Sequence, residues 1–491
     1  MRPAAIAFAV AAVAAASAHA AAEAAGGPAS MLRPQDVVQT AGFCVPAPED
    51  GTAIPRAVGA LGVGAPTTKP IAVLDTGVDP TTPELAGRVL PGVDARTGAA
   101  VGGDANGHGT QVAAIAAGSG PAFRGVSPTS PILPVRVYDD AGSATADALA
   151  KGIAIAVQKG AGTIVFSGAQ KLSEVGAPDQ LKVVRAIGDA FKKGILTVVA
   201  AGNDGDDLPS FPAALPHVIA VGGASAGGLR AAFSNKGPWV DVLAPGEGVT
   251  APLAPPSCVY GYGFATGTSF AAPAVAGIAA LVAQLRPQLD IQQRFELVRR
   301  AARDIGIEGR DNETGFGMAD AAAAMTALPQ AKENNPEVDD DPFWVRGAYA
   351  KAYPPYVTKR KKLRFKASGS VSPAKDPADV YPIEMAKGDR IVVTVSGTSA
   401  GALLELTILS PAAGDFDITN GVEKYRMAST GGLSPDPQLE ARAKRSGIHY
   451  IAIEAADPVD PEDPSAQPAA IEPYRVSAFK QHKKARKQRT K

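Results

Sequence analysis

The stretch Gly267-Thr268-Ser269-Phe270-Ala271-Ala272-Pro273 places one serine among small residues, at the start of a long apolar run that ends near Leu285. The spacing of the apolar residues in this run predicts a buried helix over residues 270–285. Pro273 is expected in the first turn of that helix, where a missing N–H costs nothing. A serine at a helix N-terminus faces backbone N–H groups and the positive end of the dipole, which suits an oxygen that gains negative charge. Taken alone, Ser269 is more simply an N-cap, so its role depends on the rest of the chain.

Upstream of this stretch, short apolar runs alternate with helical patterns. The apolar runs are nearly continuous, as strands buried on both faces require. Strands and helices that alternate at this spacing predict right-handed βαβ units, and therefore an α/β fold with a doubly wound, mostly parallel sheet. Strands are expected at residues 70–74, 131–137, 163–166, 195–200 and 217–221, and helices at residues 112–117, 144–157, 181–193, 294–303 and 319–326.

The chain of 491 residues is long enough for two or three domains. The α/β region is expected at residues 66–328, followed by an acidic linker at residues 329–345. Short β-type runs between turn residues then predict a small all-β sandwich domain at residues 346–479. The formal net charge is zero, so the composition gives no reason to expect nucleic acid as a partner.

Basic residues gather in two places in the second half of the chain, at residues 359–366 and in a tail at residues 480–491. Such runs are usually solvated surfaces or tails. The sharper alternative is a contact between the basic tail and an anionic polymer of the cell envelope. Both interpretations stay open at the level of sequence.

The N-terminus has the pattern of an export signal. Residues 1–20 begin with Arg2, continue with an apolar run and end in Ala18-His19-Ala20, which predicts a signal peptide and a secreted protein, with the periplasm or cell envelope as further destinations. Residues 21–65, rich in Ala, Gly and Pro, are expected to form an arm that lies over a domain. No later stretch has about 18 uninterrupted apolar residues, so no membrane span is expected. The only two cysteines, Cys44 and Cys258, either pair in an oxidising compartment or remain free thiols.

Four polar side chains fall at strand ends or helix starts of the predicted sheet, namely Asp75, His108, Asn203 and Ser269. Open α/β sheets build their sites at the carboxyl ends of strands. A serine hydroxyl becomes a nucleophile when a neutral imidazole removes its proton, and a carboxylate fixes the tautomer of that imidazole. The Asn203 side-chain N–H and the Ser269 backbone N–H can hold the oxyanion that forms. Together these residue types predict acyl transfer.

Each of these residues stands in its own glycine-containing motif, and the motifs follow in the order Asp, His, Asn, Ser. They are Asp75-Thr76-Gly77-Val78, Asn106-Gly107-His108-Gly109-Thr110, Ala200-Ala201-Gly202-Asn203 and the stretch around Ser269, joined by Phe233-Ser234-Asn235-Lys236-Gly237-Pro238. Through them residues 58–328 resemble the subtilisin-like serine peptidases. The resemblance implies a serine endopeptidase for protein or peptide substrates, with Asp75, His108 and Ser269 as its triad and Asn203 in its oxyanion hole.

The resemblance also implies how a substrate binds. An extended peptide would lie between two backbone segments, Gly142-Ser143-Ala144 and Ser167-Gly168-Ala169, and pair with both. Without the family resemblance, these small residues are read as ordinary turn chemistry. The short motifs Lys387-Gly388-Asp389 and Gly447-Ile448-His449-Tyr450 resemble the β-sandwich modules that follow the catalytic domain in many secreted bacterial peptidases.

Three departures from the family pattern stand out. Gln111 follows Thr110 where relatives usually have histidine, and we expect this change to affect helix packing only. Residues 21–65 look unlike the folding propeptide domain of about 70–100 residues that many relatives carry. No cofactor is expected, and although structural calcium is compatible with the family, no metal site is identified. The scattered acids Asp94, Asp104, Asp206 and Asp207 are expected to be solvated rather than calcium ligands.

Two alternatives to a secreted endopeptidase remain. One is a restricted processing or secretion-associated peptidase of the mycosin-like kind, although such enzymes usually add a C-terminal membrane helix. The other is an inactive peptide-binding protein that keeps the scaffold, which the complete set of four site residues disfavours.

Overall fold

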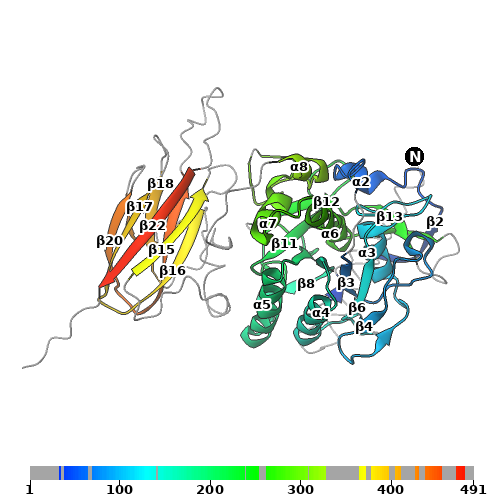
Figure 1. Cartoon of the computed structure of the whole chain (residues 1–491), viewed down its shortest axis with the longest axis horizontal. Helices are drawn as coiled ribbons and strands as arrows, with labels where there is room; N and C mark the ends of the chain where they lie inside the picture. The colour runs from blue at the N-terminus through cyan, green and yellow to red at the C-terminus, as the bar shows by residue number, and fades with distance from the viewer. Residues whose placement is uncertain are drawn as a thin grey trace, which may run out of the picture. The chain divides into compact units, whose positions relative to one another are not determined.

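The structure is a computed structural model of the whole chain, and it describes residues 33–34, 38–64, 69–139, 142–237, 239–253, 261–307, 309–327, 364–371, 378–397, 404–410, 426–430, 437–455 and 472–481. The chain divides into two compact units, one up to residue 329 except residues 308–310 and one from residue 330 onward (Figure 1). The predicted signal peptide, the acidic linker, Cys258 and residues 482–491 of the basic tail lie outside the described residues.

The first unit is built on an eight-stranded sheet in the order β12-β11-β9-β7-β3-β6-β4-β5. All neighbouring strands are parallel except β5, which pairs antiparallel with β4 at one edge. This arrangement confirms the predicted doubly wound, mostly parallel sheet. The strands are β3 (Ile71–Asp75), β4 (Gly92–Asp94), β5 (Ala100–Val101), β6 (Ile132–Arg136), β7 (Thr163–Phe166), β9 (Leu196–Ala200), β11 (Val218–Ala224) and β12 (Val242–Pro245).

Helices cover both faces of this sheet. On one face α3 (His108–Ala117) packs against α6 (Thr268–Leu285), and both share a core with Ile71 and Val73 of β3. On the other face α4 (Ala146–Gln158) and α5 (Ala177–Lys192) lie side by side (Figure 1). Gly152 of α4 approaches Leu74 there, because alternate residues of a strand point to opposite faces. Three shorter helices complete the unit, namely α2 (Ala53–Ala57), α7 (Ile291–Arg300) and α8 (Ala321–Thr326).

Helix α6 is the buried helix that the sequence predicted, but it begins two residues earlier than expected. Pro273 therefore lies inside the helix, beyond the first turn, so its predicted position was wrong. Within the described residues α6 is the helix that is long and apolar enough to cross a membrane, and 83% of its apolar window is buried inside the fold. It is a core helix of the first unit, and the expectation of no membrane span elsewhere in the chain stays a prediction.

Residues of the N-terminal arm add strands to two small sheets. β1 (Arg33–Pro34) pairs antiparallel with β8 (Gly168–Lys171), which pairs on its other edge with β10 (Ser210–Phe211). β2 (Val38–Val45) pairs antiparallel with β14 (Tyr262–Thr266), whose other neighbour is β13 (Val249–Pro252). The arm thus contacts the strand that leads directly into α6.

The second unit consists of two antiparallel four-stranded sheets, which confirms a β-rich module after the α/β region. Residues alternate between buried and partly exposed along the strands, as in β17, where Ile391, Val393 and Val395 enter the core. Strand β22 includes Lys480 and Gln481, so the sheet extends past the predicted domain end at residue 479. One sheet contains β15 (Arg364–Val371), β22 (Glu472–Gln481), β17 (Arg390–Ser396) and β20 (Gln438–Arg442), and the other β16 (Ala378–Met385), β21 (Gly447–Ala455), β18 (Leu404–Leu409) and β19 (Arg426–Ser429).

His217 immediately precedes β11, and we expect its burial to make the stability of the first unit depend on pH. Its ring is buried and stacked on Phe191 with a centroid distance of 4.2 Å. Burial, with a smaller effect of the Lys192 charge, lowers the pKa of His217 to about 3. Below pH ~6.5 the unfolded chain therefore binds a proton at this position that the folded chain does not bind, and stability falls as the pH falls.

We expect His217→Asn, in a Ser269→Ala background that prevents self-digestion, to reduce this acid sensitivity. Asparagine tolerates the positive φ of 60° at this position. Between about pH 7 and about pH 5 the unfolding free energy of the parent should fall by about 2 kcal/mol more than that of the variant. Urea denaturation at the two pH values measures this difference, and parallel pH dependences would contradict it.

Candidate active site

Asp75 is the last residue of β3, at the carboxyl edge of the sheet. Its Oδ1 accepts the Thr76 backbone N–H at 2.7 Å and lies 2.6 Å from Nδ1 of His108, and both Asp75 and His108 are fully buried. Burial raises the pKa of Asp75 above its ordinary value, and the hydrogen bonds with His108 and Thr76 oppose that rise. The carboxylate therefore holds the imidazole by its Nδ1 atom and leaves Nε2 as the atom for proton transfer.

The His108 loop is held by Asp104, which the sequence analysis expected to be solvated. One carboxylate oxygen of Asp104 accepts the Thr76 hydroxyl at 2.8 Å and the Gly107 N–H at 3.0 Å. The other oxygen accepts both the N–H and the hydroxyl of Thr110, at 2.9 and 2.7 Å. Asp104 thus ties the first turn of α3 to the end of β3, and the expectation of a solvated side chain was wrong for this residue.

Gly109 allows the close approach that the Asp75–His108 contact needs. A Cβ atom at this position would lie 2.1 Å from the Gly77 carbonyl oxygen and 3.0 Å from Cβ of Asp75. The Gly109 N–H donates to the Thr76 hydroxyl at 3.0 Å, so the helix start rests directly on the strand end. The glycine in the His108 motif is therefore required by packing.

Ser269 is the second residue of α6, and reciprocal hydrogen bonds join it to Ser167. The Ser167 hydroxyl donates to the Ser269 carbonyl at 2.8 Å, and the Ser269 hydroxyl donates to the Ser167 carbonyl at 3.2 Å. Pro273 explains the first bond, because a proline four residues later has no N–H for the Ser269 carbonyl. The His108 ring packs edge-on against Phe270 at 5.5 Å, which brings the imidazole beside the residue that follows Ser269.

Asn203 follows β9 in a turn that also meets the start of α6. Its Oδ1 accepts the Thr268 backbone N–H at 2.9 Å, which makes Nδ2 the donor end of the amide. The Gly202 N–H donates to the Thr268 hydroxyl at 3.1 Å, so two bonds hold this turn against the residue before Ser269. The structure thus links Asn203 to the helix start that carries the candidate nucleophile.

A sequence comparison agrees with this geometry. Residues 68–317, about half of the chain, match the profile of the subtilase family. The chain belongs to the subtilase family. The match covers all four residues of the candidate active site, from Asp75 to Ser269.

Three curated proteins illustrate the likeness of this subtilase to characterised relatives. The thermophilic serine proteinase of Bacillus sp. (strain AK1) is 40% identical over 46% of this chain and 55% of its own length. Thermitase of Thermoactinomyces vulgaris is 38% identical over 43% of this chain and 74% of its own length. Subtilisin Savinase of Lederbergia lenta is 33% identical over 52% of this chain and 89% of its own length.

The chain thus spans between about half and most of the length of these relatives. The matched segment is a serine endopeptidase domain of the subtilisin-like kind. The second unit lies outside the match of the family profile.

Of the two predicted substrate-binding segments in this subtilase, one runs into strand β8 and the other lies in a loop. Gly168 and Ala169 are in β8, which already pairs with Pro34 and Arg33 of the arm. Ser167 contacts Ser269 directly, as described above. Gly142, Ser143 and Ala144 lie in the loop before α4, where the Ser143 N–H donates to the Asp139 carboxylate at 2.8 Å.

The sequence analysis expected four scattered acids to be solvated rather than calcium ligands. Among the described residues, no three His, Cys, Asp or Glu side chains come together in a group that could hold a metal ion. Asp94 is buried and pairs with Arg96 at 2.6 Å, a hydrogen bond that lowers the pKa of Asp94, so the expectation of a solvated side chain was wrong for this residue too. Asp206 lies 3.6 Å from Lys171, and Asp207 is exposed.

We expect Gly109→Ala to lower both stability and activity. In an ordinary helix this change stabilises by about 1 kcal/mol, but here the added Cβ meets backbone that cannot move without separating Asp75 from His108. The melting temperature should fall, and kcat for a tetrapeptide p-nitroanilide should drop by about 10²-fold or more. Gly102→Ala is the control, because a Cβ there meets no atom within 4 Å. Unchanged kcat in Gly109→Ala would contradict this account.

Proposed function

We propose that the protein is a secreted serine endopeptidase that cleaves peptide bonds through an acyl-enzyme intermediate. Asp75, His108 and Ser269 form its triad, and Asn203 supplies an oxyanion donor. The observation that carries the proposal is the buried 2.6 Å contact between Asp75 and His108, whose ring lies beside the helix start that bears Ser269. No cofactor is proposed, because these side chains supply nucleophile, base and oxyanion donor.

In this mechanism Nδ1–H of His108 donates to Asp75, so Nε2 accepts the Ser269 proton as the hydroxyl oxygen attacks the scissile carbonyl. The negative charge of Asp75 then stabilises the imidazolium. The carbonyl oxygen of the substrate becomes an oxyanion, which the Asn203 amide and the Ser269 backbone N–H bind. His108 returns the proton to the leaving amine, and a water molecule hydrolyses the acyl-enzyme by the same steps.

Export is proposed from residues 1–20, which have the pattern of a signal peptide. Two relatives are named a minor extracellular protease and a cell wall-associated protease, but another is named a major intracellular serine protease. We also propose contact of the basic tail with an anionic envelope polymer. A restricted, mycosin-like processing role is the second candidate. It is favoured because the arm pairs with Gly168 and Ala169, where a substrate strand is expected to bind.

A fluorophosphonate probe tests the enzyme proposal, since an activated serine oxygen attacks the phosphorus of such a probe, displaces fluoride and becomes phosphonylated. We expect the probe to label the full chain at Ser269 and to leave Ser269→Ala and His108→Ala unlabelled. Mass spectrometry of the labelled peptide identifies the site. Equal labelling of the parent and both variants, or none in the folded parent, would instead support an inactive peptide-binding scaffold.

The arm should compete with substrate. β1 pairs with Gly168 and Ala169, the backbone expected to bind a substrate, and β2 pairs with β14 up to Thr266, three residues before Ser269. We expect a variant that starts at Val38 to show KM lower by about ten-fold than one that starts at Met31, because only the longer form keeps β1. Steady-state hydrolysis of one tetrapeptide p-nitroanilide compares the two. Equal KM values would show that the arm does not compete.

A further inference from the structure

Asn235 belongs to the motif Phe233-Ser234-Asn235-Lys236-Gly237-Pro238, to which the proposed mechanism gives no role. The residue is buried, with only 1% of its surface exposed. A buried amide is costly unless its donors and acceptors find partners, so the partners of Asn235 indicate what it does.

Except for the hydroxyls of Ser210 and Ser234, the described hydrogen-bond partners of Asn235 are backbone atoms of the turn that carries Asn203. The Asn235 N–H donates to the Gly202 carbonyl at 3.0 Å, and its Oδ1 accepts the Asp204 N–H at 2.8 Å. Its Nδ2 donates to the Ala201 carbonyl at 3.4 Å and to the Ser210 hydroxyl at 3.0 Å. These bonds hold the backbone before Asn203, at Ala201 and Gly202, and after it, at Asp204. None of them involves the Asn203 side chain.

This turn needs stabilising contacts from outside because it contains Gly202. Gly202 has a φ of +107°, a conformation that side chains rarely adopt, and glycine leaves the turn free to take other conformations. A Cβ at position 202 would lie 2.5 Å from Nδ2 of Asn235, so the amide occupies the space beside the glycine. Asn203 itself is held at its other end by the Thr268 N–H.

We propose that Asn235 is a positioning residue for the oxyanion donor Asn203. This inference rests on the proposed function, in which the Asn203 amide binds the oxyanion. Asn235 holds the Ala201–Asp204 backbone from one side while Thr268 holds the Asn203 Oδ1 from the other. The amide Nδ2 is thus fixed before the substrate arrives, and an oxyanion donor acts through such preorganisation.

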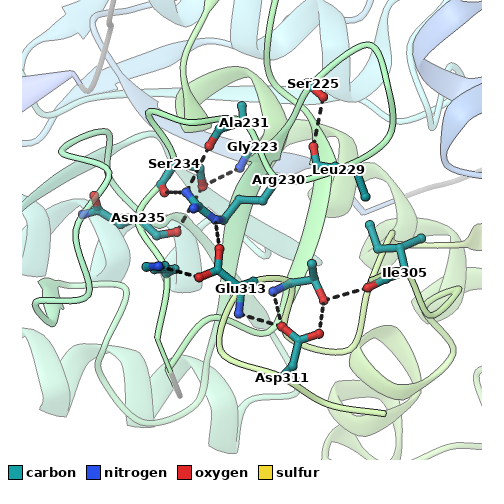
Figure 2. A network of polar contacts seen from close by, with 12 residues as sticks. Gly223, Ser225, Leu229, Arg230, Ala231, Ser234, Asn235, Ile305, Asp311 and Glu313 are labelled. Atoms are coloured by element: carbon teal, nitrogen blue, oxygen red, sulfur yellow. Dashed lines mark hydrogen bonds and ion pairs between the residues drawn. The ribbon is translucent and has the colours of Figure 1, made fainter. Parts of the chain in front are cut away.

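The loop that carries Asn235 is anchored by a separate polar network (Figure 2). Arg230 donates to the Ser234 carbonyl at 2.6 Å, and Glu313 pairs with Arg230 at 2.7 Å and with Lys236. The Ser234 hydroxyl accepts the Gly223 N–H at 2.9 Å. Figure 2 shows the Asn235 side chain directed away from Glu313, and the side-chain bonds of Glu313 go to Arg230 and Lys236 rather than to the turn that carries Asn203.

This separation supplies the matched control. Asn235→Ser removes both the Oδ1 acceptor and the Nδ2 donor that bind the turn. Glu313→Gln weakens the ion pairs that anchor the same loop and keeps the Asn235 side chain. We expect Asn235→Ser to lower kcat for a tetrapeptide p-nitroanilide by about ten-fold or more, with KM within about two-fold. Glu313→Gln should lower the melting temperature and leave kcat within about two-fold of the parent.

The decisive measurement combines Asn235→Ser with Asn203→Ala. If Asn235 acts through Asn203, Asn235→Ser should cost less than about two-fold in kcat once the Asn203 amide is absent. A full ten-fold loss in both backgrounds would overturn the inference. Should Asn235→Ser not fold, Asn235→Asp takes its place, because it keeps the acceptor for the Asp204 N–H and loses the donor to Ala201.

The outcomes also separate this inference from the proposed function. Asn203→Ala is expected to lower kcat by about 10²–10³-fold with little change in KM. Normal kcat in Asn203→Ala would reject the oxyanion role itself. A loss of kcat in Asn203→Ala together with normal kcat in Asn235→Ser and Asn235→Asp would reject only the positioning role.

Discussion

The contact between Asp75 and His108 is the interaction on which the rest of the first unit depends. Both side chains are fully buried, and the Asp75 Oδ1 atom both accepts the Thr76 N–H and contacts Nδ1 of His108. The surrounding contacts hold together the strand end and the helix start that carry this pair. Asp104 fixes the helix start, Gly109 lets α3 rest on the end of β3, and the Phe270 ring packs against the imidazole with a centroid distance of 5.5 Å.

The central sheet could be predicted from the sequence because its strands are continuous apolar runs buried on both faces. The runs ending at Asp75 and at Ala200 were located within about one residue, and so were the turns that follow them. Strands β8 and β14 were not predicted as strands. Their residues are small or mixed, and pairing with the distant arm makes them strands, which local patterns do not reveal.

The same distinction applies to the candidate site. The residues proposed for the chemistry stand in recognisable motifs, and the order of these motifs predicts a triad and an oxyanion asparagine. The roles of the surrounding residues could not be predicted in this way. Asp104 was expected to be a solvated acid, and Asn235 stood in a motif without an assigned role, because most of their partners are backbone groups that only the folded chain brings near. Pro273 was expected in the first turn of α6, where a missing N–H costs nothing. It lies further inside the helix, so the Ser269 carbonyl has no helical donor and accepts the Ser167 hydroxyl instead.

The pairing of β2 with β14 has a consequence for biosynthesis. Val45 pairs with Tyr262, so β2, which lies near the start of the described chain, cannot join its sheet until the distant strand β14 has been made. Joining such distant segments is entropically costly and slow, and synthesis adds a further delay. While the ribosome is still making the middle of the protein, β2 has no partner and the helix bearing Ser269 does not yet exist. The sheet beside the candidate nucleophile is therefore completed only late in synthesis.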